Sequence, residues 1–407
     1  MTSRKRTQML VVLIALVAIV PANAQGTYTV LYTLQGGTDG SGPSGPLWFA
    51  LVGTAKVPTL YGTTVQGGNG GCYGNLGCGT VFQVNANTHN EKVLWRFQGG
   101  PNDGNSPIGG VVKVGNGFFG NTNSGGSAEE GAVYKLSGTT ESPIASLSGT
   151  AIFPSGAMVW NGTTKTLYGT AGQGGNTTGS CGSAGCGSVF TVNATTGAVT
   201  TLHQFAGMPS DGAGPWGLIR DAAGNLYGVT SLGGGSLCNG AGCGTIFEIT
   251  AAGKYRLLHS FAGGTSDGWQ PGNGLVFDSV NKILYGSTEF GGANSKGIVF
   301  SFNLGTRTYA VIYNFGSGEN GIFPRGGLVL DSTGHLWGLA AGGSNSAGII
   351  FELINSGGTW GTGTVFSFPG GTQGVVGNYG LTYDSVSGNF YGTAIGAAGG
   401  LVFQYHP

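Results

Sequence analysis

Short apolar segments alternate with turn-forming residues along most of the chain, and one stretch shows the arrangement clearly. Residues 217–221, 225–230, 244–249 and 255–261 are rich in β-branched and aromatic side chains, and Gly, Asp and Asn separate them. Runs of this composition, bounded by such residues, are typical of β-strands. Four of them in succession, with a glycine-rich loop between the second and the third, predict a four-stranded antiparallel meander.

The same four-segment unit recurs through the chain. Its second segment carries a variant of Leu-Tyr-Gly-Thr-Thr, whose aromatic residue is found at Tyr61, Phe119, Tyr168, Tyr227, Tyr285, Trp337 and Tyr391. These positions are 49 to 59 residues apart, and repetition at a nearly fixed period indicates a tandem-repeat fold. Seven units account for residues 25–407, which we expect to form one domain.

Many of the predicted strands are apolar on both faces, as in residues 81–82 and 349–351. Such strands need cover on both sides, which radially arranged four-stranded sheets provide and which a solenoid provides only with capping units. The last unit ends with its third strand, 401–405, whereas residues 28–34 form a strand without a unit of its own. We therefore predict an all-β, seven-bladed β-propeller whose ring is closed by residues 28–34 completing the last blade.

The N-terminus has the features of a signal peptide. Arg4, Lys5 and Arg6 precede an apolar stretch at 9–20, and Ala22-Asn23-Ala24 supplies the small residues that signal peptidase recognises. We expect residues 1–24 to be a signal peptide cleaved after Ala24, because twelve apolar residues are too few for a span of roughly 20. The mature protein is then secreted or periplasmic, with no membrane span.

The amino-acid composition limits the classes of partner that the protein is expected to bind. Only 8% of residues are charged and the formal net charge is zero, so 16 scattered Lys and Arg residues do not form a basic surface for nucleic acid. Glycine contributes 86 of 407 residues without a Gly-X-Y period, which is consistent with a folded protein dense in turns.

The repeat resembles a known family. The succession Asp-x-x-Gly-Asn-Leu-Tyr-Gly-x-Thr, Gly-Gly, Gly-Thr-x-Phe, Leu-x-x-Phe, Asp-Gly and Pro-x-Gly-Leu is clearest at 221–261 and 278–315 and extends over 28–405. In these motifs the chain resembles the GloVer tandem-repeat family, which implies an exported bacterial protein with a β-propeller-like fold and no established activity. Two units depart from the pattern, with Gly120-Asn121-Thr122 and Gly338-Leu339-Ala340 in place of the central motif.

The six cysteines fall into three local pairs, each just before a predicted third strand: Cys72 and Cys78, Cys181 and Cys186, Cys238 and Cys243. In an exported protein we expect three disulfides. A zinc site needs four converging ligands, and no pair has a histidine nearby, so we expect neither a metal nor another cofactor.

Meander topology places the glycine-rich loops and the connections between blades on one face, here called the long-loop face; short turns such as 221–224 and 331–334 form the opposite, short-turn face. Longer loops on a rigid scaffold tend to carry function.

Around the channel mouth we expect successive units to contribute Leu47, Ile108, Ser155, Trp216, Gly272 and Arg325. The predicted ligand-binding residues are Trp216, Trp269, Arg325, Asp103, Asp211 and Asp267. Two alternatives stay open: the aromatic residues fill gaps between blades, and the aspartates form Asp-Gly turns.

The sequence contains no convincing catalytic motif, and we therefore expect no catalytic residues. The Gly-x-Ser-x-Gly match at 264–268 lies in a repeat loop, His203 and His259 occupy a position that holds aromatic residues in other units, and no glutamate–histidine cluster is evident. We therefore expect a non-catalytic binding or scaffold propeller, monomeric, with extracellular glycan or another cell-surface partner as its ligand. The alternatives are a polysaccharide lyase or glycosidase using Arg325, Asp211 and Asp267, and a purely structural envelope protein.

Overall fold

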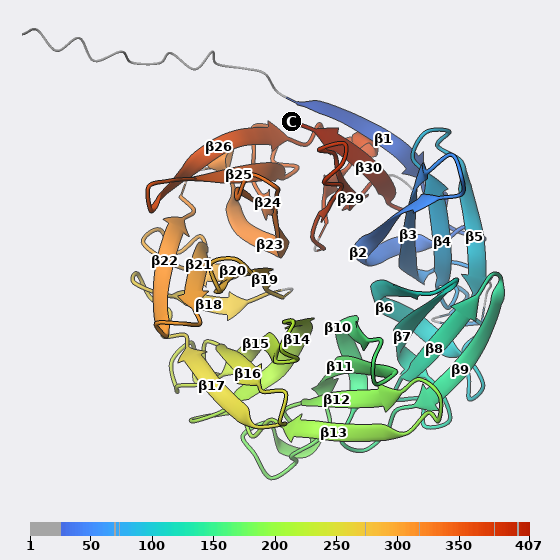
Figure 1. Ribbon diagram of the computed structural model, residues 1–407, viewed down its shortest axis with the longest axis horizontal. Coiled ribbons are helices and arrows are strands. Elements are labelled where there is room, and N and C mark those ends of the chain that lie inside the picture. The colour runs from blue at the N-terminus through green and yellow to red at the C-terminus, as the bar shows by residue number, and fades with distance from the viewer. Residues whose placement is uncertain are drawn as a thin grey trace, which may run out of the picture.

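The computed structural model describes residues 26–407 except 69, 70, 73, 273, 317, 378, 397 and 398; the predicted signal peptide lies outside the described residues. The described chain forms seven antiparallel sheets arranged radially around a central axis (Figure 1). The protein is a seven-bladed β-propeller, as the repeat predicts.

The first four blades follow chain order from the axis outward. Blade 1 consists of β2 (Ser41–Val52), β3 (Val57–Gln66), β4 (Thr80–Asn85) and β5 (Glu91–Arg96). Blade 2 consists of β6 (Gly104–Val114), β7 (Gly117–Gly125), β8 (Ala132–Ser137) and β9 (Thr140–Ser146). Blade 3 consists of β10 (Ile152–Asn161), β11 (Thr166–Gln173), β12 (Ser188–Asn193) and β13 (Val199–Gln204). Blade 4 consists of β14 (Gly212–Arg220), β15 (Leu226–Gly233), β16 (Thr245–Ile249) and β17 (Tyr255–Ser260).

In two of the remaining blades the innermost strand is divided. Blade 5 consists of β18 (Gly268–Pro271), β19 (Val276–Asp278), β20 (Ile283–Gly291), β21 (Ile298–Asn303) and β22 (Thr308–Asn314). Blade 6 consists of β23 (Ile322–Leu330), β24 (Leu336–Ala341), β25 (Ile349–Ser356) and β26 (Thr359–Ser367). Blade 7 consists of β27 (Val375–Val376), β28 (Thr382–Tyr383), β29 (Phe390–Ile395), β30 (Leu401–His406) and β1 (Thr27–Thr33).

Helical structure is limited, over the described residues, to the 3₁₀ turns η1 (Gly182–Ala184), η2 (Gly318–Asn320) and η3 (Gly371–Gln373). None of the helical segments in this part of the chain is long and apolar enough to span a bilayer.

The ring closes where the sequence predicts. β1 pairs antiparallel with β30, from Thr27 opposite His406 to Thr33 opposite Leu401. In Figure 1 β1 forms the outer edge of the blade that contains the C-terminus. The first and last segments of the chain therefore share a sheet, and the ring has no open blade edge between them.

A glycine in each second strand faces an aromatic residue of the third strand, and this pair explains the two main repeat motifs. Gly228 lies directly opposite Phe247, and a Cβ built on Gly228 would lie 2.5 Å from that ring. The other pairs are Gly62–Phe82, Gly120–Tyr134, Gly169–Phe190, Gly286–Phe300, Gly338–Phe351 and Gly392–Phe403. The missing side chain thus makes room for a buried ring in every blade.

Neighbouring blades interlock through a glycine and a proline. Gly244, just before β16, lies against Pro271 of the next blade, where a Cβ on the glycine would be 2.5 Å from the proline Cδ. The same contact joins Gly400 to Pro43 across the closure of the ring. Seven clusters of buried hydrophobic residues fill the seams between adjacent blades. The expectation of strands buried on both faces is therefore confirmed.

The structure corrects two details of the sequence interpretation. The first strand of the fourth unit begins at Gly212 rather than 217, because pairing with β15 continues on both sides of a register shift between Trp216 and Leu218. In blade 1 the position equivalent to Trp216 is Ser44 and not Leu47, because Pro43 takes the place of Pro215 against the second strand. Leu47 is instead buried against Gly62.

The three predicted disulfides are present, with Cα–Cα distances of 5.1, 5.2 and 5.3 Å for the pairs Cys72–Cys78, Cys181–Cys186 and Cys238–Cys243. The second cysteine of each pair is buried. Its carbonyl accepts a hydrogen bond from the first strand of the next blade, as in the Gln270 amide to the Cys243 oxygen at 3.0 Å. Each bridge therefore stabilises a loop at the seam between two blades.

Candidate functional site

A pocket of about 360 Å³ lies at the channel mouth, and we call it the mouth pocket. It is lined by Trp216, Ser231, Gln270, Pro271, Gly272, Glu289, Pro324, Arg325 and Tyr379. Ser231 and Glu289 are near the ends of β15 and β20 that lead into the glycine-rich loops. The pocket is therefore on the long-loop face, where blades 4, 5, 6 and 7 meet.

Two aromatic residues form its apolar part. Trp216 in β14 and Tyr379 after β27 are both half-buried, and each also borders an apolar cavity of about 170 Å³ inside the channel. Burial raises the pKa of the Tyr379 phenol, so its hydroxyl stays protonated and able to donate a hydrogen bond. These two residues separate the polar mouth from the apolar channel.

Glycine backbone forms much of the wall of the inner cavity. Glycines from all seven blades line the inner cavity: Gly45, Gly109, Gly156, Gly217, Gly274, Gly327 and Gly380. A Cβ on Gly45 would lie 2.2 Å from backbone atoms of Gly109 and Gly110 in the next blade, so the innermost strands approach as closely as their backbones permit. The mouth pocket therefore adjoins an inner cavity whose wall is largely glycine.

The polar part of the pocket is an ion pair beside a fixed amide. Arg325 Nη2 lies 3.1 Å from Glu289 Oε1, and the arginine side chain is 43% exposed. Gln270 has a φ of 60°, a left-handed conformation that non-glycine residues rarely adopt. The hydrogen bond to the Cys243 carbonyl and the following Pro271 hold this conformation, so Gln270 is presented at a defined place in the pocket.

Of the sequence-predicted ligand residues, the structure brings Trp216 and Arg325 together in the mouth pocket. Trp269 is a neighbour of the pocket residue Gln270 but does not line the pocket. Its ring packs on Phe290 at a centroid distance of 5.2 Å, and its Nε1 is buried and makes no hydrogen bond within the described residues.

Asp211 and Asp267 lie outside the pocket, in the connections between blades. Asp211 accepts hydrogen bonds from His203 Nε2 at 3.0 Å and from Tyr255 hydroxyl at 2.6 Å, and also from the amides of Ala206 and Gly212. Burial alone would raise the pKa of Asp211, but these hydrogen bonds outweigh it and hold the pKa below its usual value. The carboxylate is therefore charged and fully engaged in joining blade 3 to blade 4.

The same arrangement recurs one blade later. Asp267 accepts hydrogen bonds from His259 Nε2 at 3.1 Å, from Tyr309 hydroxyl at 2.6 Å and from the amides of Ala262 and Gly268. Its pKa is also lowered by these hydrogen bonds, against the effect of burial. The two histidines are thus parts of inter-blade contacts.

Asp103 occupies the corresponding connection between blades 1 and 2, with a different partner. It accepts hydrogen bonds from the amides of Gln98 and Gly104. Glu141 takes the place that Tyr255 has in blade 4, opposite the last apolar residue of the third strand. Burial and then the Asp103 charge raise the pKa of Glu141 to about 8.

Sequence reasoning missed Gln270, Glu289, Ser231 and Tyr379 as pocket residues. One signal was available: Ser231 and Glu289 both follow the threonine of the second-strand motif, a position that holds valine at 65 and alanine at 341. Glu289 is the one acidic residue at this repeat position. No comparable repeat signal marks Tyr379.

A model of the Gloeobacter/Verrucomicrobia repeat matches residues 74–276 and, in a second overlapping match, 176–405. The chain belongs to the Gloeobacter/Verrucomicrobia repeat family. The matches cover most of the blades of this repeat protein, which confirms the resemblance seen in the sequence motifs.

Solved structures similar to this repeat protein share its fold at low identity. Oligogalacturonate lyase from Vibrio parahaemolyticus is 12% identical with a TM-score of 0.57, and the match covers 95% of this chain and 94% of that one. An oligogalacturonate lyase in complex with manganese is 12% identical with a TM-score of 0.51, and the match covers 90% and 98%. These likenesses support the propeller fold. No match to a curated protein sequence was found.

Proposed function

We propose that this protein is an exported, non-catalytic propeller that binds extracellular glycan in the mouth pocket. One observation carries the proposal: Trp216 and Tyr379 lie in the same pocket as Gln270, Glu289 and Arg325. Sugars present an apolar face and a fixed ring of hydroxyls, so a glycan site needs an aromatic surface with polar partners beside it.

The size of the pocket suits a short segment of a glycan. Its volume of about 360 Å³ is at the lower end of the range of roughly 300–1,000 Å³ typical of ligand sites. A chain end or a single residue of a polysaccharide, held across blades 4 to 7, fits this geometry.

The rest of the molecule suits an extracellular setting. Three disulfides are stable where thiols are oxidised, and the low charge offers no basic surface for nucleic acid. Residues 1–24 have the sequence features of a signal peptide. Secretion or export to the periplasm is thus part of the proposal.

The test is retention of the oxidised protein on a panel of soluble and insoluble polysaccharides, with analysis of the same samples for shortened or unsaturated products. Trp216→Ala should reduce retention about tenfold or more, because truncation of a central aromatic residue removes stacking area. Trp48→Ala is the matched control: Trp48 is 37% exposed and does not line the pocket.

Retention that is lost in Trp216→Ala and kept in Trp48→Ala supports the mouth pocket as the site. Equal retention of both variants and the wild type contradicts it. Product formation that depends on Arg325 or Glu289 would replace the binding proposal with a carbohydrate-active enzyme acting at the same mouth.

A further inference from the structure

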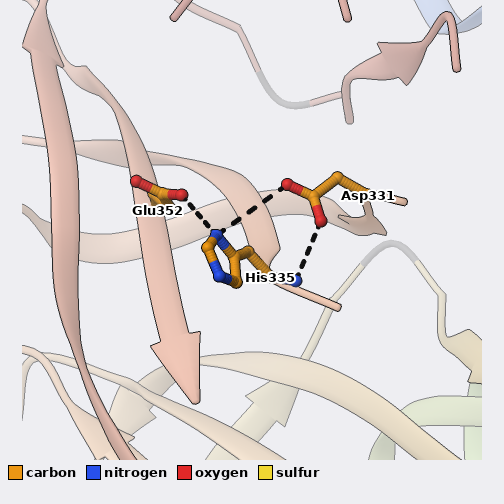
Figure 2. A group of neighbouring side chains, drawn as sticks. All are labelled: Asp331, His335 and Glu352. Atoms are coloured by element: carbon orange, nitrogen blue, oxygen red, sulfur yellow. Dashed lines mark hydrogen bonds and ion pairs between the residues drawn. The ribbon is translucent and has the colours of Figure 1, made fainter. Parts of the chain in front are cut away.

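The second cluster of polar residues is on the short-turn face of blade 6, remote in the fold from the mouth pocket. Asp331 follows β23, His335 precedes β24, and Glu352 lies within β25 (Figure 2). These residues are up to 21 positions apart in the chain, and the hairpin between β23 and β24 and the pairing with β25 bring them together. The sequence alone showed no such glutamate–histidine cluster.

One imidazole nitrogen faces both carboxylates. His335 Nδ1 lies 2.7 Å from Glu352 Oε1 and 4.0 Å from Asp331 Oδ2 (Figure 2). One ligand atom from each of the three residues lies within 4.8 Å of the others. Zinc bound at about 2.0–2.2 Å places tetrahedral ligand atoms about 3.4 Å apart, so shifts of less than about 1 Å would bring the three atoms into a coordination sphere.

Blade 4 has the same positions with a different charge balance, and it serves as an internal comparison. There Asp221 and Glu248 correspond to Asp331 and Glu352, and Asn225 takes the place of His335. Glu248 is neutralised by Arg256 at 3.0 Å and by Arg307 at 3.4 Å.

Blade 6 lacks these cations. Glu352 Oε2 accepts a hydrogen bond from the Thr364 amide at 2.8 Å, and Gly363 beside it leaves space for the carboxylate. Within the described residues, the ion pairs of Asp331 and Glu352 are with His335 alone. Asp331 and Glu352 therefore share one imidazole, whereas Glu248 in blade 4 has two arginines, Arg256 from its own outer strand and Arg307 from the turn between β21 and β22 of blade 5.

The carboxylates are held in place before any ion binds. Asp331 Oδ1 accepts hydrogen bonds from the Thr333 amide and hydroxyl and from the His335 amide, and Oδ2 accepts one from Trp337 Nε1 at 2.9 Å. Glu352 is 7% exposed and fixed by Thr364. Such outer hydrogen bonds orient ligands and reduce the entropy lost on metal binding.

We propose that Asp331, His335 and Glu352 form a binding site for a divalent first-row transition metal ion, with zinc as its reference ion. His335 Nδ1, Asp331 Oδ2 and Glu352 Oε1 are the three protein ligands, and water completes the coordination. One imidazole with two carboxylates suits zinc and its neighbours better than calcium, which takes more oxygen ligands. The ion supplies to Glu352 the positive charge that Arg256 and Arg307 supply to Glu248.

Zinc titration of the oxidised, chelator-treated protein near neutral pH, followed by calorimetry and by metal analysis after dialysis, tests the site. The wild type should bind one zinc ion dependent on His335 and gain thermal stability with zinc. His335→Asn places the blade 4 residue in blade 6 and should weaken this binding at least about 100-fold, more than the loss of an outer hydrogen bond typically does. Its circular dichroism and its melting temperature without zinc serve as folding checks.

Two variants act as controls. His89→Asn alters an exposed loop histidine and should leave the zinc stoichiometry unchanged. Asn225→His rebuilds the imidazole in blade 4 but should create no second site, because Arg256 and Arg307 already neutralise Glu248.

Absence of zinc binding by the wild type, or equal binding by His335→Asn, overturns the proposal. A zinc anomalous peak between His335 and Glu352 in a soaked crystal, lost in His335→Asn, supports it.

Discussion

The ring of His203 stacks on that of Tyr255 at a centroid distance of 3.7 Å and an interplanar angle of 2°, and both residues bind the carboxylate of Asp211. His203 belongs to the outer strand of blade 3, and Tyr255 to the outer strand of blade 4. One carboxylate and one stacked pair thus join two neighbouring blades at their rim. His259, Asp267 and Tyr309 repeat the contact between blades 4 and 5.

A double-mutant cycle measures this contact. Asp211→Asn should lower the free energy of unfolding by about 2 kcal/mol, and Tyr255→Phe by about 1 kcal/mol, because both remove hydrogen bonds to a partly buried charge. Since the two residues share one bond, the double mutant should lose less than the sum of the two. Denaturant unfolding of the four proteins gives the coupling.

Tyr309→Phe is the control for this cycle, because Tyr309 binds Asp267 in a different seam. Its effect should add to that of Asp211→Asn. If the effects of Asp211→Asn and Tyr255→Phe on the free energy of unfolding are also additive, the hydrogen bond between these two residues contributes nothing to stability.

Two other seams carry glutamate where Tyr255 stands, and they predict a pH dependence. Burial and then Asp103 raise the pKa of Glu141 to about 8, and burial and then Asp39 raise that of Glu91 to about 7. In the unfolded chain both carboxyl groups ionise near their usual pKa of 4.5. In the folded protein Glu91 stays protonated up to a pH of about 7 and Glu141 up to a pH of about 8. Their contribution to stability is therefore full below pH 4.5 and decreases as the pH rises toward 8.

Glu141→Gln should raise the free energy of unfolding at pH 8.5 by roughly 1–2 kcal/mol and leave it nearly unchanged at pH 5, because glutamine resembles the protonated acid. Unfolding curves at these two pH values measure the difference. Glu319→Gln alters an exposed carboxyl and should follow the wild type at both values. Parallel pH profiles of Glu141→Gln and the wild type would contradict the assignment.

The sequence predicts the architecture well because each blade is built by local steric rules. Gly228 must face Phe247 and Gly244 must face Pro271, so these residues recur at a fixed period that can be recognised without a structure. The N-terminal strand at residues 28–34, which has no unit of its own, likewise predicted how the ring closes. The disulfides followed from close pairs of cysteines in a protein with the features of an exported chain.

The site is harder to predict, because its residues differ between units and become neighbours through the ring. Glu289 and Arg325 come from different blades, and Asp331 meets Glu352 only through the pairing of three strands. Leu47 was misplaced for a similar reason: Pro43 and Pro46 both precede it, and the contact of Pro43 with Gly400 exists only when the ring is closed. Cleavage after Ala24 stays a prediction.

The disulfide loops offer a matched pair of substitutions. Gly263 and Gly264 are adjacent, with φ values of 65° and 70°, so alanine is strained at either position. A Cβ on Gly263 would lie 2.7 Å from Cys238 Sγ, whereas a Cβ on Gly264 would meet nothing within 4 Å. Gly263→Ala should therefore lower the melting temperature more than Gly264→Ala, with the backbone penalty of about 1 kcal/mol common to both.

The same pair tests whether the bridge is the cause. When Cys238 and Cys243 are both replaced by serine, the difference between Gly263→Ala and Gly264→Ala should shrink, because the oxidised sulfur atoms are no longer held against the glycine. Thermal unfolding of the six proteins, with and without the bridge, gives this comparison. An unchanged difference would locate the strain in the backbone alone.

Closure of the ring gives the last prediction. Deletion of residues 26–34 removes β1 and exposes the hydrogen-bonding edge of β30, together with buried side chains of the seam such as Val402. An open strand edge and an uncovered apolar face favour aggregation, so the truncated protein should unfold at a lower temperature and associate on size-exclusion chromatography. A circular permutant that carries the same strand after Pro407, on a flexible linker long enough to turn back along β30, restores the antiparallel pairing. It should recover the elution volume of the wild type and most of its melting temperature, because the strand contributes through its place in blade 7 and not through its position in the chain. Failure of the permutant, with the truncated protein remaining folded and monomeric, would mean that the other blades hold the ring without this strand.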